Sequence, residues 1–354
     1  MQTPSVVAFF NEKLCAFLDL KRYLCGHMPQ LIPTLQRAAI ITAVAIVVIP
    51  GQPVNAAEGG SGFYLLGQRG QGAAPVLPEG VFFSLPTFFL SSDVSGSQPL
   101  EAGGFATLGL DADVKVTMPS ALWMTPVEFL GGGLGLSATL VYGNADLSAD
   151  IGISIPEIGD FGVTDSDDRW AMGDPVLSAF LGWNGDNYAY TLTTSVNVPA
   201  GDYDLGRLSN VSLNYWAVDV TAAGTWLFPQ NKIELSAATG FTFNDENDDT
   251  KYETGTEFHL EAAAHYQFSP TFSAGLNGYY YNQVSGDSGK GATLGSLKGQ
   301  VTGIGPGLSG TFMVGPAPVS VSFRYFHEFN AKNRLEGNSA WLTLTIPLWV
   351  PDGS

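Results

Sequence analysis

The chain has 354 residues, of which 14% are charged and 12% aromatic, and its formal net charge is −18. Soluble domains carry about 25% charged residues, so this composition is unusually apolar for a soluble protein. The acidity argues against nucleic acid as a partner, because phosphate binding requires clustered Lys and Arg side chains.

The first part of the chain, residues 1–56, is predicted to be a leader that is removed. An apolar run at 38–49 follows a basic residue and precedes small residues, which is the pattern of a secretory signal peptide. Ala56 suits the last position before a cleavage site, so cleavage is expected after it. Residues 1–27 precede Met28 and are interpreted either as a misassigned start or as part of an unusually long leader.

Alternating polar and apolar residues predict strands over most of the remaining chain. Such alternation places the two kinds of side chain on opposite faces of a strand. Residues 57–79 are instead rich in Gly and are predicted to form a plug or a periplasmic segment, and 351–354 form a tail after a barrel at 80–350. The expected strands are 81–90, 107–118, 134–142, 146–155, 176–183, 188–198, 215–228, 232–244, 258–268, 272–282, 301–314, 319–329 and 341–348.

The connections between these strands alternate in length. Outer-membrane barrels have short periplasmic turns and long outer loops. We therefore predict an all-β fold, an antiparallel up-and-down transmembrane β-barrel of about 12–14 strands that follows the cleaved signal peptide. A soluble, secreted sandwich or lipocalin-like barrel is the alternative, since its strands would also alternate. Short turns are expected at 184–187, 229–231, 269–271 and 315–318, and long loops at 199–213, 245–254, 283–300 and 330–338.

The strand at 258–268, together with the residue before it, carries the most polar face. Glu257, His259, Glu261 and His265 alternate with apolar residues. Neighbours on one face of a strand lie roughly 7 Å apart. That spacing favours the lining of a polar lumen over a metal site or a catalytic base.

Other inward-facing residues combine aromatic and charged groups. Arg324 is placed to pair with Glu257 or Glu261 across the lumen. Inward aromatic rings offer contacts to an apolar solute, although they can equally pack a narrow interior. The predicted solute-contacting residues are Glu257, His259, Glu261, Tyr279, Tyr281, Arg324 and Phe326.

The sequence contains no motif of a known catalytic or cofactor site. There is no GxSxG nucleophile elbow, phosphate-binding loop or dinucleotide fingerprint. The acidic runs at 165–168 and 245–249 resemble calcium ligands by charge but lack the glycine-punctuated spacing, so they are expected to be solvated loops. We predict no enzyme activity, no cofactor and no metal. Two alternatives stay open: a structural barrel without a transport role, and, less favoured, a lipid-modifying barrel enzyme that uses His259.

Several segments are similar to one known family. They are EGGSGFYLLG (Glu58–Gly67), GDP (173–175), VPAGDYD (198–204), NYW (214–216), EFHLE (257–261), GDSG (286–289) and the stretch Phe323–Leu348, which is the most specific. With these segments the chain resembles the outer-membrane proteins named after the meta-cleavage pathway of phenol degradation, a family regarded as transporters.

This resemblance implies a location in the outer membrane of a Gram-negative bacterium. The function it implies is a channel for passive uptake of small hydrophobic or aromatic compounds, linked to aromatic degradation. The expected partners are outer-membrane lipid and lipopolysaccharide, the transported solutes and the barrel-assembly machinery. The family supplies no agreed catalytic residues.

Overall fold

The computed structural model describes residues 57–58, 62–75, 77–99, 105–155, 159–207, 209–293, 295–315 and 317–351. The predicted leader and the last three residues of the predicted tail lie outside these ranges. Within them, no helix is both long enough and apolar enough to cross a membrane.

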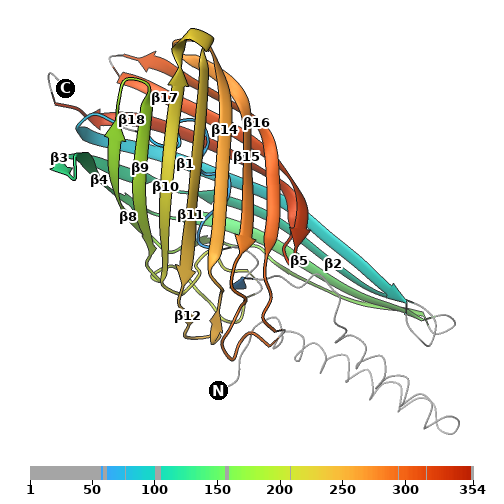
Figure 1. Ribbon diagram of the computed structural model, residues 1–354. Coiled ribbons are helices and arrows are strands. Elements are labelled where there is room, and N and C mark those ends of the chain that lie inside the picture. Colours follow the sequence, from blue (N-terminus) through green and yellow to red (C-terminus); the bar gives the residue numbers. More distant parts are fainter. Residues whose placement is uncertain are drawn as a thin grey trace, which may run out of the picture.

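Antiparallel strands make up most of the described chain from residue 80 onward (Figure 1). In chain order they are β1 (Gly80–Pro99), β2 (Phe105–Thr117), β3 (Ser120–Phe129), β4 (Gly132–Thr139), β5 (Tyr142–Ile155), β6 (Gly159–Asp167), β7 (Trp170–Met172), β8 (Val176–Asn184), β9 (Tyr188–Asn197), β10 (Ala217–Phe228), β11 (Ile233–Asn244), β12 (Glu246–Asn247), β13 (Tyr252–Glu253), β14 (Glu257–Ser269), β15 (Phe272–Gln283), β16 (Gln300–Val314), β17 (Ala317–Lys332) and β18 (Glu336–Trp349). A single 3₁₀ turn, η2 (Pro229–Asn231), joins β10 to β11.

Pairing of β1 with β18 closes the sheet into a barrel, which confirms the predicted fold. Three runs of consecutive strands each act as one long strand of the barrel, because the members of a run pair with the same neighbouring run. These runs are β2–β3, β4–β5 and β6–β7–β8. Counting each run once, the described residues form a ring of twelve strands, within the predicted range. Closure pairs the backbone groups that a bilayer cannot hydrate.

Some strand boundaries differ from the prediction. β1 extends to Pro99 rather than ending at residue 90, and β3 and β6 were not predicted. Pro126 lies in β3 where the register with β4 shifts, so the alternation is interrupted there. The acidic run at 165–168, predicted to be a loop, lies largely in β6. A charge-rich segment of this kind forms a strand because it pairs with β5 outside the bilayer, where charged side chains stay hydrated.

The two ends of the barrel differ in the length of their connections, as predicted. The prediction of a long loop at 330–338 was wrong, because β17 runs to Lys332 and β18 begins at Glu336, which leaves only 333–335 between them. The turn end carries η2, the short turns at 130–131, 185–187 and 270–271, and the turn that begins at Gly315. The loop end carries the connections at 198–216, 245–256, 284–299 and 333–335. In outer-membrane barrels the long loops face the cell exterior, so we infer that orientation here.

Four strands continue beyond the loop end of the others and form an extension. β1 pairs with β18 as far as Asp93, and from there to Pro99 it pairs with β2 alone. β2, β5 and β6 pair with one another out to the tips of their hairpins. Figure 1 shows β2 and β5 reaching well past the rest of the barrel at the lower right.

The polar and apolar faces of the strands are reversed between the two sides of the barrel. On β14 the charged Glu261 is buried inside and Leu260 is 41% exposed outside. On β2 the apolar Val116 is buried inside, and Asp113 is exposed outside. A charged outer face is costly in hydrocarbon. The outer face of β2 therefore lies beyond the bilayer, whereas that of β14 contacts lipid.

Exposed aromatic rings bound the lipid-facing band. Rings in this position mark the two membrane interfaces of a barrel. Tyr142 stacks on Trp170 with ring centroids 5.3 Å apart, just below the charged outer face of β2 and β5. The exposed aromatic residues near the turn end include Phe129, Tyr188, Phe228, Phe268, Phe272, Phe312 and Trp349, and those nearer the loop end include Tyr142, Trp170, Trp216, Phe241 and Phe243.

A charge introduced in the middle of this band tests its position. Ala262 is exposed halfway along the outer face of β14. Ala262→Arg is expected to lower the free energy of unfolding by about 2–4 kcal/mol, the cost of Arg at a bilayer midplane. Denaturant titration of the protein folded into lipid vesicles measures the change.

Ser91→Arg is the matched control, because Ser91 is an exposed small residue that faces Asp113 across β1 and β2. It lies above the aromatic boundary, so its replacement is expected to leave the stability unchanged within about 0.5 kcal/mol. Equal losses in the two variants would contradict the placement of the band.

Candidate functional site

A cavity of about 740 Å³ lies inside the barrel. Sites for small organic ligands typically have volumes of about 300–1,000 Å³ and mostly apolar walls. β8, β9 and the connection that follows β9 contribute to its lining, together with two further parts of the chain that differ in chemistry. One is the inner face of β1, β2 and β5, and the other is the N-terminal segment, residues 62–75.

The inner face of β1, β2 and β5 forms an apolar wall of the cavity. It arises from strand alternation, since every second residue of these strands points inward. Polar side chains of β8 and β9 continue the lining beside it. The apolar wall consists of Phe88, Leu90, Ala112, Val114, Val116, Met118, Val141, Ala145 and Leu147.

The N-terminal segment is held against the opposite, polar side of the barrel by buried carboxylates. The Glu261 carboxylate accepts hydrogen bonds from the backbone N–H of Gly67 at 3.0 Å and of Arg69 at 2.8 Å. The Glu234 carboxylate accepts one from Gly72 N–H at 2.6 Å and another from the Gln71 side chain at 3.1 Å. An irregular segment has no ladder partners for its amides, so these carboxylates supply the acceptors.

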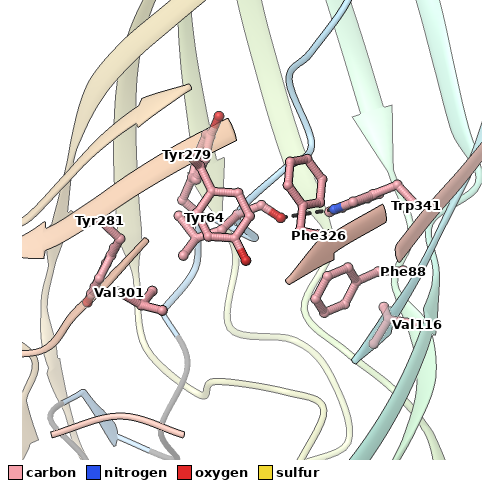
Figure 2. Packing of buried hydrophobic residues seen from close by; sticks show 9 residues of the cluster. Tyr64, Phe88, Val116, Tyr279, Tyr281, Val301, Phe326 and Trp341 are labelled. Atoms are coloured by element: carbon pink, nitrogen blue, oxygen red, sulfur yellow. Dashed lines mark hydrogen bonds between the residues drawn. The ribbon is translucent and has the colours of Figure 1, made fainter. Parts of the chain in front are cut away.

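Aromatic rings pack around the middle of the segment (Figure 2). Trp341 Nε1 donates a hydrogen bond to the Leu66 carbonyl at 2.9 Å, drawn as the dashed line. Phe326 packs against Tyr279, with ring centroids 4.9 Å apart. Gly67 has a φ of +80°, and a Cβ there would lie 2.6 Å from the Phe326 ring. The close approach of segment and barrel at this point therefore requires glycine.

His259 lies beneath the segment rather than on an open surface. Tyr64 stacks on its ring with centroids 3.5 Å apart and planes 13° from parallel. Its Nε2 is 2.9 Å from Asp219 Oδ2, and Asp219 also accepts a hydrogen bond from Thr242. The imidazole is only 1% exposed. This packing attaches the segment to the barrel and leaves no room for a substrate over the ring.

All seven predicted solute-contacting residues point into the barrel and are buried. Two of them, Tyr279 and Arg324, line the cavity. Glu257, His259, Glu261, Tyr281 and Phe326 do not belong to its lining and are instead packed against other parts of the interior. Solute contact by these residues stays a prediction.

The expected ion pair of Arg324 with Glu257 or Glu261 is not formed. Among the described residues, no Arg324 nitrogen lies within 4.0 Å of a carboxylate oxygen. The Glu261 oxygens are instead occupied by backbone amides of the N-terminal segment. Glu257 accepts hydrogen bonds from Tyr281 and Asn244. The prediction was wrong because the segment supplies donors that strand periodicity does not show.

Sequence reasoning also missed residues that shape the site. Glu234 could have been found, since it alternates with the outward Ile233 and Leu235 on one strand. The apolar wall could not have been found from the sequence. Alternation separates the two faces of β2 but does not say which face points inward.

A second cluster of buried polar groups lies at the loop end. Asp287 is 4% exposed and accepts hydrogen bonds from the Tyr252 hydroxyl and the Gly255 amide. Burial and the nearby charge of Asp287 raise the pKa of Tyr252 well above its usual range. Burial also raises the pKa of Glu58 to about 7, against hydrogen bonds from Thr250 and Asn247 that lower it. The described residues contain no group of three or more His, Cys, Asp and Glu side chains placed to hold a metal ion.

A solved outer-membrane channel supports the barrel architecture of this chain. The COG4313 outer membrane channel from Pseudomonas putida F1 is 15% identical, with a TM-score of 0.55 over 78% of this chain and 98% of that one. A Pseudomonas aeruginosa FadL homologue is 10% identical, with a TM-score of 0.42 over 83% and 97% of the two chains. The CymD monoaromatic hydrocarbon channel is also 10% identical, with a TM-score of 0.35 over 76% and 88%. No curated protein matches the sequence.

Residues 96–344 match the model of the family described as "Putative MetA-pathway of phenol degradation". The match covers well over half of the chain and nearly the whole barrel. It agrees with the resemblance inferred from the sequence segments, and the barrel has the lipid-facing band of an outer-membrane protein. The chain is therefore an outer-membrane β-barrel that belongs to the MetA-pathway phenol degradation family.

Proposed function

We propose that the protein is a passive channel through which small hydrophobic or aromatic compounds cross the outer membrane. The observation that carries the proposal is the cavity of about 740 Å³ with an apolar wall on β1, β2 and β5. An apolar solute gains free energy when it leaves water for such a wall, at about 25 cal/mol per Å² of buried surface. The family description supports a link to the degradation of aromatic compounds.

The apolar wall is suited to solutes that polar porins exclude. Its residues lie opposite the carboxylate-rich side of the barrel, and the N-terminal segment covers those carboxylates. A solute in the cavity therefore meets aliphatic and aromatic groups on one side and a mixed surface on the other. Arg324 and Glu328 line that mixed side and offer hydrogen bonds to a polar substituent such as a hydroxyl group.

We further propose that residues 57–79 act as a plug rather than as a periplasmic segment. Their attachments extend from Glu58, bonded to Asn247 at the loop end, to Ala74, bonded to Thr225 near the turn end. Within the lumen the segment narrows the path to the cavity beside it. Movement of the segment would change the width of the path.

A charge placed on the apolar wall tests the channel. Val114 points into the cavity, and Val114→Asp would introduce a carboxylate that an apolar solute cannot hydrate. Uptake of radiolabelled toluene by cells that produce the variant is expected to fall roughly tenfold, which corresponds to a loss of about 1.4 kcal/mol in the passage barrier.

Asp113→Asn is the control for this variant, since Asp113 is the neighbouring residue on the outer face of β2. It is expected to leave toluene uptake unchanged at equal amounts of protein in the outer membrane. If cells that lack the protein took up toluene as fast as cells that contain it, the channel proposal would be refuted.

Loss of an acceptor carboxylate tests the plug. Glu261→Gln replaces one of the two oxygens that accept hydrogen bonds from backbone amides by an amide NH₂ group, which cannot accept them. The segment is therefore expected to be held less firmly. Single-channel recordings in planar bilayers should show a larger and noisier ion current than the unmodified protein.

Glu257→Gln is the matched control, because Glu257 is equally buried on the same strand, does not line the cavity, and accepts its hydrogen bonds from Tyr281 and Asn244 rather than from the segment. It should leave the current unchanged. The same current in the unmodified protein and both variants would show that the segment does not limit the path.

A further inference from the structure

The first described residue, Ala57, is enclosed in the loop-end cluster. It is 2% exposed, and its backbone nitrogen lies 3.4 Å from Asp287 Oδ2. The next residue, Glu58, donates its backbone N–H to Thr254 at 3.1 Å and accepts a hydrogen bond from Asn247. The start of the N-terminal segment is therefore anchored at the loop end, in the connections that follow β11 and β15.

As long as a peptide bond joins Ala57 to the residue before it, the buried carboxylate of Asp287 accepts hydrogen bonds only from neutral groups. The donors are the amides of Ala57 and Gly255, the Gln283 side chain and the Tyr252 hydroxyl. In the described part of the chain, no Lys or Arg nitrogen lies within 4.0 Å of it. A buried charge without an opposite charge is costly. The site therefore lacks a cation.

The backbone of Ala57 gives an independent indication. Its φ is +67°, in the left-handed region that alanine rarely adopts. Part of the steric conflict in that region comes from the carbonyl oxygen of the preceding residue. A chain that began at Ala57 would have no such carbonyl, so the conformation would be free of that conflict.

We propose that the protein is cleaved between Ala56 and Ala57 and that the new α-ammonium group of Ala57 forms a buried ion pair with Asp287. Hydrolysis of the peptide bond by a signal peptidase adds one water: the hydroxyl group joins the Ala56 carbonyl carbon and a proton joins the Ala57 nitrogen. At neutral pH that amine takes up a second proton from solvent and becomes an ammonium group. The existing distance of 3.4 Å already suits an ion pair.

This processing would make the anchoring of the plug depend on cleavage. The ammonium group would supply the positive charge that Asp287 lacks, and it would lie beside Glu58, whose carboxyl is also buried near the charge of Asp249. Uncleaved protein would present a neutral amide at the same place. The inference goes beyond transport, because it concerns how the mature chain is produced and locked, whatever solute crosses the barrel.

The test uses protein purified from outer membranes. Intact mass and N-terminal sequencing are expected to give Ala57 as the first residue. Acylation with acetic anhydride near pH 7 then measures access to the α-amine, which is less basic than Lys side chains and reacts first. An ion pair that raises the amine pKa by one unit leaves about tenfold less free amine, so the folded protein should react at least about tenfold more slowly than the unfolded chain.

Two variants separate the ion pair from simple burial. Asp287→Asn removes the charge, and insertion of one Gly between Ala56 and Ala57 moves the amine about 3.8 Å away from Asp287. Both are expected to restore most of the unfolded rate. Asp174→Asn is the control, since Asp174 is equally buried in a loop-end hydrogen-bond cluster but contacts residues 197–214 instead.

The outcomes are distinct. A first residue other than Ala57, or an α-amine that reacts at the unfolded rate in the folded, unmodified protein, would overturn the proposal. Equal acceleration by Asp287→Asn and Asp174→Asn would also overturn it, because general loosening of the loops would then explain the change. None of these results depends on whether toluene crosses the barrel.

Discussion

The hydrogen bonds between buried carboxylates and backbone amides are the interaction on which the interior depends. Glu234 and Glu261 point into the barrel, where an unpaired carboxylate is costly. The segment at 62–75 has irregular backbone, whose amides need acceptors for the same reason. The carboxylates accept hydrogen bonds from these amides, and the bonds hold the segment along one side of the lumen. The cavity is the space that remains on the other side.

The division of the lumen explains why two walls of one barrel differ in chemistry. Strands β11 and β14 present carboxylates and imidazoles inward because the segment covers them, as Tyr64 covers His259. Strands β1, β2 and β5 present aliphatic and aromatic groups to the cavity, and two of these, Phe88 and Val116, also pack in the core cluster that includes Leu66 of the segment. Lining the whole interior with charge would exclude apolar solutes, and lining it with hydrocarbon would leave the segment without acceptors.

The extension of β1, β2, β5 and β6 beyond the loop end is related to the reversal of polar and apolar faces between β2 and β14. Where β1, β2, β5 and β6 pass the aromatic boundary, their outer face meets water instead of lipid, and it carries Asp113 and other acidic residues. Strands that leave the bilayer can therefore place their apolar residues inward. This arrangement carries the apolar wall toward the exterior, which is the side from which a solute would arrive.

Alternation and connection length were enough to predict a closed antiparallel barrel with a turn end and a loop end. They failed where alternation is weak, as at Pro126 in β3, and where an acidic strand such as β6 resembles a loop. For the site, the inward positions of Glu257, His259 and Glu261 followed from their spacing. The partners of Glu261 did not, because backbone amides nearly 200 positions earlier in the chain supply them.

The sequence by itself determined the architecture, since a period of two residues and a dozen strand-length repeats suit few structures other than a barrel. Only the tertiary structure decided which face of each strand points inward. The alternation of Asp113 with Val114 reads the same in either orientation. The environment of each strand settles the choice: lipid outside and a polar segment inside for β14, water outside and an open cavity inside for β2.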